Sequence, residues 1–249
     1  MSYSRSFLGK GTIYRRKRGV ANAPLEPMGN CSKLVFNVEQ ERIDELDYES
    51  AGGGKRMTIY RISGVTAAIT TNNHDPMILA LGLRGIVTEQ DSVAPITGEA
   101  HADVAKGSLV VFDRFPDLTQ PIVVKKGAAT IAKAANYEPK RVGIFILADA
   151  VGVTAGDDIT VEYTPLAEDT VEALTVSGDE YYLFFDGLNE AASGKPVAVE
   201  AMRLNFSPMK SLGLVTTELG DVELEAEVLG DESVTAEDES KYFRYRAVK

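Results

Sequence analysis

Residues 29–62, GNCSKLVFNVEQERIDELDYESAGGGKRMTIYRI, contain two strand-like runs joined by an acidic, glycine-rich segment. Leu34, Phe36 and Val38 alternate with mostly more polar neighbours, which is typical of a strand with one buried face. Residues 56–62 have the composition of a second strand. The stretch therefore predicts a long β-hairpin with an extended loop over residues 41–55, whose glycine triplet makes its tip flexible.

A second stretch, residues 181–230, is predicted to complete the same sheet. Strand-like runs recur there at residues 181–185, 197–206, 212–216 and 221–229. In the last run, glutamates alternate with apolar residues: Glu223, Glu225 and Glu227 against Val222, Leu224, Ala226 and Val228. A strand with this period of two places its apolar face against the core, so the glutamates are expected to face water.

One short helix is predicted after the hairpin. Asp75 is a suitable N-cap, Pro76 suits the first helical position, and Gly85 can end the helix after an apolar run. From residue 88 to 176 the chain changes to short strand-like runs separated by glycine-containing turns. That pattern is typical of a small β-sandwich of the immunoglobulin-like kind.

These patterns predict a mainly β protein with a discontinuous core. Residues 1–30 are expected to form an N-terminal arm, because glycines and prolines interrupt every apolar period there. Residues 31–87 and 177–249 are expected to form the core domain, and residues 88–176 the inserted β-sandwich domain.

The composition is that of a globular protein: 249 residues, 44% of them hydrophobic, with a formal net charge of −11. No apolar run approaches the roughly 18 residues that a membrane-spanning helix needs. No signal-peptide pattern is present either, so we expect a soluble protein that is not secreted by the usual route. The single cysteine, Cys31, is expected to be a small buried residue and not a catalytic thiol.

Charge is unevenly distributed along the chain. The first 25 residues carry no acid, so they have a charge of +6, and the remainder of the chain has a charge of −17. The six bases are Arg5, Lys10, Arg15, Arg16, Lys17 and Arg18. Two roles fit such an arm, namely binding nucleic acid or pairing with the acidic body of a neighbouring copy. The second is favoured, because opposite charges on one kind of chain suit self-association.

No motif in the sequence indicates catalysis. The glycine triplet before Lys55 does not form a phosphate-binding loop, because Glu49 stands where the first glycine belongs and Arg56 follows the lysine. The S-x-x-K match at residues 207–210 contains Pro208, which would break the helical turn that such a nucleophile needs. The two histidines are not part of any cluster with metal-ligand spacing. We therefore expect no enzyme, no cofactor and no metal.

Three parts of the chain resemble one known family, the major tail tube proteins of tailed bacteriophages. Residues 29–56 resemble the first strand and long hairpin loop of that family, and residues 75–83 fall where the family has its single helix. Residues 186–215, DGLNEAASGKPVAVEAMRLNFSPMKSLGLV, followed by the acidic strand, are similar to its C-terminal half. Residues 136–147 and 157–164 are similar to the decorating β domains that some tube proteins carry.

The resemblance implies a structural subunit of a siphophage-type tail tube. Its core would be a tail-tube-type β-sandwich or barrel, related in fold to secretion-system ring and tube proteins. Hexameric rings would stack into a hollow tube that conducts DNA during infection, without specific DNA binding and without a membrane. The tape measure, tail terminator and distal tail proteins would be further partners. The protein would belong to the virion tail and be assembled in the host cytoplasm.

Two alternatives remain beside this interpretation. The first is a secretion-system tube ring protein, which would share the fold. The second is a β-sandwich adhesin or carbohydrate-binding module. An adhesin usually has a secretion signal and exposed aromatic platforms, whereas this chain has no such signal and no tryptophan.

The tail-tube interpretation assigns contact and channel residues. Contacts between subunits are expected from the arm and the hairpin loop, at Arg15, Arg16, Lys17, Arg18, Asp47, Tyr48, Gly52, Gly53, Gly54 and Lys55. Glu223, Glu225 and Glu227 are candidate lumen-facing residues, since an acidic channel repels phosphate and lets DNA slide. Alternation alone does not say which aqueous side is meant, so a solvated outer edge remains the second interpretation for this strand.

Overall fold

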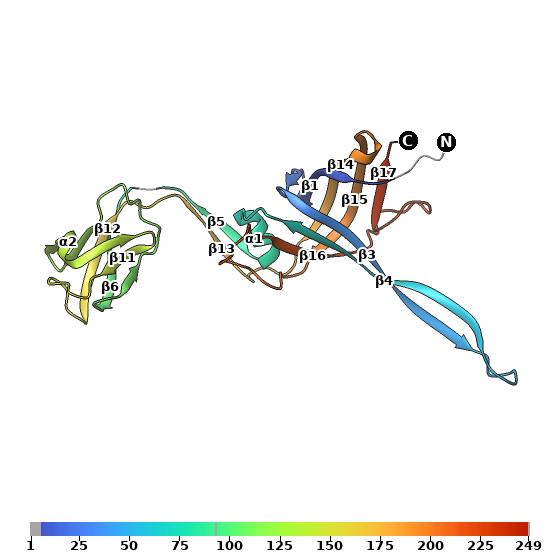
Figure 1. The fold of residues 1–249 in the computed structure, drawn as a ribbon, viewed down its shortest axis with the longest axis horizontal. Coiled ribbons are helices and arrows are strands. Elements are labelled where there is room, and N and C mark those ends of the chain that lie inside the picture. Colours follow the sequence, from blue (N-terminus) through green and yellow to red (C-terminus); the bar gives the residue numbers. More distant parts are fainter. Residues whose placement is uncertain (1–5, 93, 249) are drawn as a thin grey trace. The chain divides into compact units, whose positions relative to one another are not determined.

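The computed structural model describes residues 6–92 and 94–248, and it confirms a mainly β protein (Figure 1). The described residues form seventeen strands, two α-helices and one short 3-10 helix, η1 (Glu190–Ala192). The chain divides into two compact units. Unit 2 is Thr88–Thr170, and unit 1 is built from the chain on either side of it. The insertion predicted from the sequence begins at the same residue and ends slightly later, at residue 176.

Unit 1 is built on one antiparallel sheet in the order β2-β1-β14-β15-β16-β4-β3, with β17 paired to β15. The strands are β1 (Gly9–Lys17), β2 (Glu26–Pro27), β3 (Cys31–Leu46), β4 (Lys55–Thr71), β14 (Glu180–Asn189), β15 (Lys195–Phe206), β16 (Val222–Val228) and β17 (Phe243–Ala247). Because β16 lies between β15 and β4, the two distant stretches do form one sheet, as predicted.

The core of unit 1 lies on one face of this sheet and is covered by helix α1 (Pro76–Leu83). The helix begins as predicted: the backbone N–H of Met77 donates to Oδ1 of Asp75 at 2.9 Å. Its end differs from the prediction, since Arg84 and not Gly85 takes the left-handed conformation, with a φ of 48°. Fully buried core side chains include Ile13, Met28, Ile69, Leu183, Leu204 and Leu224.

The prediction of an unstructured N-terminal arm is wrong for most of the described part of residues 1–30. Strand β1 pairs with β14 along its whole length, from Gly9 opposite Asn189 to Lys17 opposite Tyr181. Its alternation buries Ile13 in the core, and the backbone N–H of Met28 donates to the carbonyl of Ile13 at 2.8 Å. The segment therefore contributes a strand to the core sheet.

Two further expectations about unit 1 need correction. Only part of the acidic segment predicted as a loop over residues 41–55 is a loop, because β3 continues to Leu46 and β4 begins at Lys55, which leaves residues 47–54 as the connection. The apolar run at residues 212–216, predicted as a strand, lies instead in the irregular loop that joins β15 to β16.

Unit 2 has its own two sheets and its own core. One sheet has the order β10-β11-β7 and the other β6-β12-β8-β9. The elements are β6 (Ile96–Val104), β7 (Leu109–Val111), β8 (Val123–Lys126), β9 (Ala129–Ile131), α2 (Lys133–Asn136), β10 (Tyr137–Lys140), β11 (Gly143–Ile146) and β12 (Asp157–Tyr163). The sequence did not predict α2 or β6. Where the chain passes between the units, β5 (Ile86–Gln90) and β13 (Glu168–Glu172) pair with each other.

Candidate assembly surfaces

The outer half of the β3–β4 hairpin is a two-stranded ribbon. Its strands pair with each other in a continuous register, for example Ile43 opposite Ile59 and Asp44 opposite Thr58. From Glu39 to Leu46 every residue of β3 is exposed. The ribbon runs out from the sheet of unit 1 (Figure 1). A two-stranded ribbon is at best marginally stable alone, so this hairpin is a feature that a contacting surface would stabilise.

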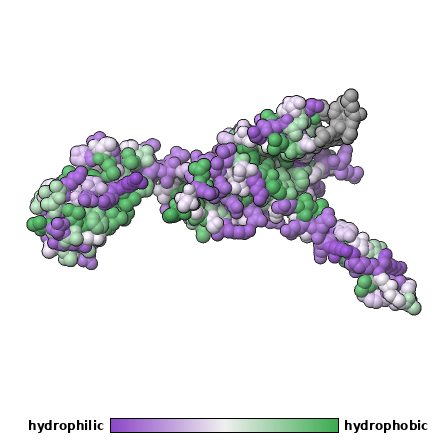
Figure 2. Space-filling view, in the orientation of Figure 1, coloured by the Kyte–Doolittle hydropathy of each residue, from purple (hydrophilic) through white to green (hydrophobic). Residues whose placement is uncertain are grey.

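Apolar side chains gather near the end of this ribbon. A hollow of about 300 Å³ is lined mainly by Ile43, Leu46, Tyr48, Met57 and Ile59, all of which are exposed. Figure 2 shows hydrophobic residues at this end, beyond a hydrophilic stretch of the same hairpin. Clustered apolar residues on an otherwise polar projection are typical of an interaction site.

A polar network holds the two strands of the ribbon together behind its tip. Lys55 donates to Oδ2 of Asp44 at 2.6 Å, while Thr58 and Arg42 donate to Oδ1 at 2.8 and 2.9 Å. The Lys55 and Thr58 hydrogen bonds, in that order, hold the pKa of Asp44 at about 2. Lys55, predicted as a contact between subunits, therefore already pairs within its own chain.

The turn of the hairpin places the other predicted loop residues at an exposed tip. Asp47 accepts from the backbone N–H groups of Glu49 and Ser50 at 2.8 and 3.1 Å, which starts the turn. Gly52, Gly53 and Gly54 have φ values of 110°, 64° and 152°, conformations that residues with a side chain rarely adopt. These glycines are therefore required by the turn, and Tyr48 projects from it.

Arg15 and Arg16, two of the four arm cations predicted to contact a neighbouring subunit, are fixed within the chain. Arg15 is buried, with a side chain 7% exposed, and its Nη2 lies 3.2 Å from a carboxylate oxygen of Glu26. The guanidinium of Arg16 lies over the ring of Tyr182, 4.9 Å from its centre. Arg15 therefore already pairs within its own chain, and its predicted contact with a neighbouring subunit stays a prediction.

The other two cations also have partners in unit 1. Lys17 pairs with Asp179 at 2.6 Å. Arg18 donates to Asp231 at 2.7 Å and to the carbonyl of Met202 at 2.6 Å. The predicted basic arm is therefore mainly a strand, and Lys10, Arg15, Arg16, Lys17 and Arg18 all have partners within unit 1. The Arg18 contact also fixes Asp231, which follows β16 and is buried.

Removing the Arg18–Asp231 contact is expected to destabilise unit 1. The Arg18 hydrogen bond, supported by Ser233, lowers the pKa of Asp231 to about 2, so the contact stabilises the fold above the unfolded pKa near 4. This stabilisation is lost as the pH falls towards 2. We expect Arg18→Met to reduce the free energy of unfolding by about 1–2 kcal/mol at pH 7, and by less near pH 2.

Denaturant unfolding at both pH values measures this difference. Lys10→Met is the matched control, because the side chain of Lys10, on the strand that ends just before Arg18, makes an exposed ion pair with Glu190 at 2.9 Å. Such pairs contribute little. An effect of Arg18→Met no larger than that of the control would show that the contact does not hold the C-terminal segment.

Strand β16 shows the predicted alternation along its whole length. Its four apolar residues are buried and Glu223, Glu225 and Glu227 are exposed. Two cations reduce the negative charge of this face. Lys210 pairs with Glu225 at 2.9 Å. Lys33 and Lys210 line, together with Glu223 and Glu225, a hollow of about 190 Å³. The exposure of these glutamates fits both a channel lining and an outer surface, so both interpretations stay predictions.

Strand β3 leaves a long backbone edge open. It stands at the end of the sheet order and pairs only with β4 among the described strands. At the other end, β2 covers only Tyr14 and Arg15 of β1. Open edges of this length are templates for pairing with another chain. An apolar hollow of about 410 Å³, lined in part by Phe36 and Phe185, lies near these strands.

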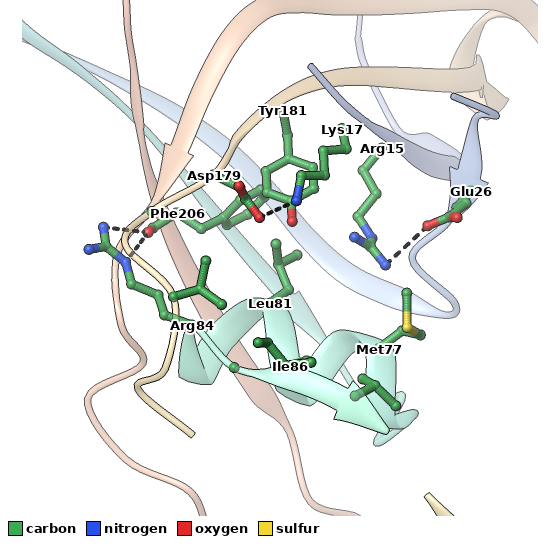
Figure 3. A pocket seen from close by; sticks show the side chains of 15 residues that line it. Arg15, Lys17, Glu26, Met77, Leu81, Arg84, Ile86, Asp179, Tyr181 and Phe206 are labelled. Atoms are coloured by element: carbon green, nitrogen blue, oxygen red, sulfur yellow. Dashed lines mark hydrogen bonds and ion pairs between the residues drawn. The ribbon is translucent and has the colours of Figure 1, made fainter. Parts of the chain in front are cut away.

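A third surface, the helix pocket, lies beside α1 and has a volume of about 530 Å³ (Figure 3). The sequence analysis did not find it, because its lining comes from distant parts of unit 1. Its apolar lining is Met77, Ala80, Leu81, Ile86, Val87, Val176, Tyr181 and Phe206. Burial raises the pKa of the Tyr181 hydroxyl, which keeps this wall uncharged at neutral pH.

The charged groups of the helix pocket comprise three cations and two carboxylates: Arg15, Lys17 and Arg84 with Glu26 and Asp179. Arg84 is held by the carbonyl of Phe206, at 3.0 Å from Nε and 2.8 Å from Nη2. The buried Nε of Arg15 has no hydrogen-bond partner among the described residues. The pocket therefore combines an apolar wall with a net positive charge.

Neither a metal centre nor a membrane helix is found in the part of the chain that the structure describes. No group of three or more potential metal-ligating side chains occurs within residues 6–92 and 94–248. No helix in the same ranges is both long and apolar enough to cross a bilayer.

The sequence matches one family over residues 6–246, nearly the whole chain. The chain belongs to this family, which is described as "Protein of unknown function UCP028589". A search of curated proteins gives no match.

Proposed function

We propose that this protein is the structural subunit of a bacteriophage tail tube. Six copies close into a ring, and rings stack into a hollow tube that conducts DNA. The observation that carries the proposal is the β3–β4 hairpin, a long ribbon whose apolar residues are left exposed by the described part of its own chain. The sequence resemblance to tail tube proteins supports the same assignment.

The energetics of the hairpin favour contact with another subunit. Fully burying a side chain such as isoleucine or methionine contributes about 1.5–3 kcal/mol. Ile43, Met57 and Ile59 are partly exposed in the protomer, so about half of this free energy remains to be gained on assembly. In a stack of rings, the hairpin of one ring is the element that reaches the next.

The open sheet edges favour closure into a ring. Pairing the outer edge of β3 with a neighbouring copy satisfies backbone groups that the protomer leaves open. A head-to-tail contact of this kind generates a closed ring when the rotation from one copy to the next is a full turn divided by a whole number. Six copies are what the resemblance implies.

The glutamate face of β16 is proposed to line the channel. Glu223 and Glu227 would repel DNA phosphates, while the Lys210–Glu225 pair would contribute no net charge. DNA would then pass without being held. The protein would act in the virion tail, together with the tape measure, terminator and distal tail proteins.

Electron microscopy of the purified full-length protein tests this function. We expect six-fold rings and hollow tubes as the concentration increases, with the β16 glutamates directed at the central axis in a reconstruction. Monomer at every concentration and salt, by mass measurement, would contradict the tube assignment. Glutamates directed away from the axis would contradict only the channel assignment and would favour the outer-surface interpretation.

A further inference from the structure

The loop between β15 and β16, residues 207–221, presents apolar side chains to solvent. Leu214 is 81% exposed, Val215 98% and Leu219 86%, which is unusual for large apolar residues on one short loop. From residue 211 to 221 the loop carries two acids, Glu218 and Asp221, and no base. The loop therefore combines apolar side chains with negative charge.

The beginning of this loop is anchored to unit 1. The backbone N–H of Met209 donates to the carbonyl of Gly82 at 2.7 Å, and Lys210 pairs with Glu225. Within the loop, the Thr216 hydroxyl donates to the carbonyl of Glu218 at 2.7 Å. These contacts fix where the loop leaves the sheet, so its apolar residues are presented at a defined place on the protomer.

The helix pocket has complementary properties. Helix α1, PMILALGL, carries no charged residue, yet Met77 on its pocket side is exposed, as is Ile86 across the pocket. A helix that is apolar on all sides is normally covered. The volume of about 530 Å³ lies within the roughly 300–1,000 Å³ of typical binding pockets. The excess cation and the unpaired Arg15 Nε favour an occupant with a carboxylate.

The loop does not occupy the helix pocket of its own chain. Among the described residues that line the pocket, none comes from residues 207–221. The apolar, acidic loop and the apolar, cationic pocket are thus two unpartnered surfaces of opposite charge on one molecule. Complementary surfaces at different places on a protomer produce head-to-tail association.

We propose that the loop of one copy docks into the helix pocket of a second copy. Leu214 and Val215 pack against α1, and Glu218 approaches the pocket cations. This inference rests on the proposed function, because it names a contact through which neighbouring tube subunits associate. It is independent of the hairpin and of the open strand edges.

Substitution of the loop tests the contact by its effect on self-association. We expect Val215→Ser to raise the protein concentration needed for assembly by roughly tenfold or more, as for an interface hot spot. Val151→Ser is the matched control, because Val151 is 87% exposed in unit 2 and plays no part in the contact. Equal effects of the two substitutions would overturn the proposal.

Disulfide cross-linking tests the geometry directly. Cys31 is the only cysteine, so Cys31→Ser provides a background for Val215→Cys and Met77→Cys, made as separate proteins, one of them tagged. Because each carries one thiol, a bond between the two positions can form only between copies. We expect the mixed dimer to exceed each symmetric dimer by much more than the roughly twofold excess that random pairing of equal amounts produces.

The outcomes separate this inference from the proposed function. Tubes without the mixed dimer would overturn the loop contact and leave the tube assignment standing. The mixed dimer without tubes would support the contact and count against the tube. Absence of both would contradict both proposals, since cross-linking is measured at the same concentrations whether or not tubes form.

Discussion

A protein with a shortened β3–β4 hairpin is expected to remain folded but to lose polymerisation. Gln40 lies opposite Ile62 in the register, so residues 41–61 can be replaced by an Asn-Gly turn that closes the two strands where they already meet. None of the removed residues belongs to the core of unit 1. We expect the free energy of unfolding to change by less than about 1 kcal/mol.

The effect on assembly should be large because the deletion removes the main exposed apolar cluster of the hairpin. Ile43, Met57 and Ile59 are 39%, 51% and 42% exposed, so burying what remains of all three contributes about 2–4 kcal/mol, and losing it raises the assembly concentration by roughly thirtyfold or more. Light scattering measures polymerisation, and circular dichroism with denaturant unfolding measures the fold. Arg56→Ala is the control within the hairpin, since Arg56 makes only long, exposed ion pairs at 3.9 and 4.0 Å.

Two results would contradict this prediction. Tubes from the shortened protein at wild-type concentrations would show that the hairpin does not join subunits. Loss of the folded state would show that the ribbon supports its own protomer, which its exposure and its absence from the core argue against.

The sequence predicted the sheet where local alternation and burial agree. Strand β16 and the inner half of the hairpin follow a period of two, and the N-cap at Asp75 is a local signal that the structure confirms. The prediction was wrong where charge suggested a loop. Residues 41–46 are strand because cross-strand pairs, such as Glu41 opposite Arg61, accommodate the charges.

Strand β1 was missed for a related reason. Its glycines and cations obscured the alternation, and Arg15 lies on the buried side beside Ile13, where a sequence pattern expects an apolar residue. The run at residues 212–216 produced the opposite error, since its apolar residues suggested a buried strand, whereas Leu214 and Val215 are in fact exposed. A sequence pattern cannot distinguish apolar residues meant for the core from those that remain on the surface.

The helix pocket had no signal in the sequence at all. Arg15, Leu81 and Tyr181 are far apart along the chain and meet only because β1 pairs with β14 beside α1. Once β1 was interpreted as a mobile arm, the pocket could not be anticipated. Predicting a site of this kind requires the sheet topology, and therefore the correct placement of every strand.

Core substitutions in the two units are expected to act separately. Leu204 and Ile144 are fully buried, the first in the core of unit 1 and the second in that of unit 2, and the two cores share no residue. Replacing either with alanine removes buried methyl groups and leaves a cavity, which costs about 2–5 kcal/mol. We expect each substitution to destabilise only its own unit, with a melting temperature about 10 °C or more lower for unit 2 in Ile144→Ala.

Calorimetry of the monomeric protein measures the two transitions, and segment-resolved hydrogen exchange assigns them. Faster exchange in residues 88–170 alone should accompany Ile144→Ala, and Leu204→Ala should affect the remainder of the chain. A single transition that moves with either substitution would mean that the units fold as one and would contradict their independence.

Independent cores have a consequence for assembly, because the hairpin, the open edges and the helix pocket all belong to unit 1. Ile144→Ala should therefore leave polymerisation unchanged at temperatures where unit 1 is folded, whereas Leu204→Ala should abolish it as soon as unit 1 melts.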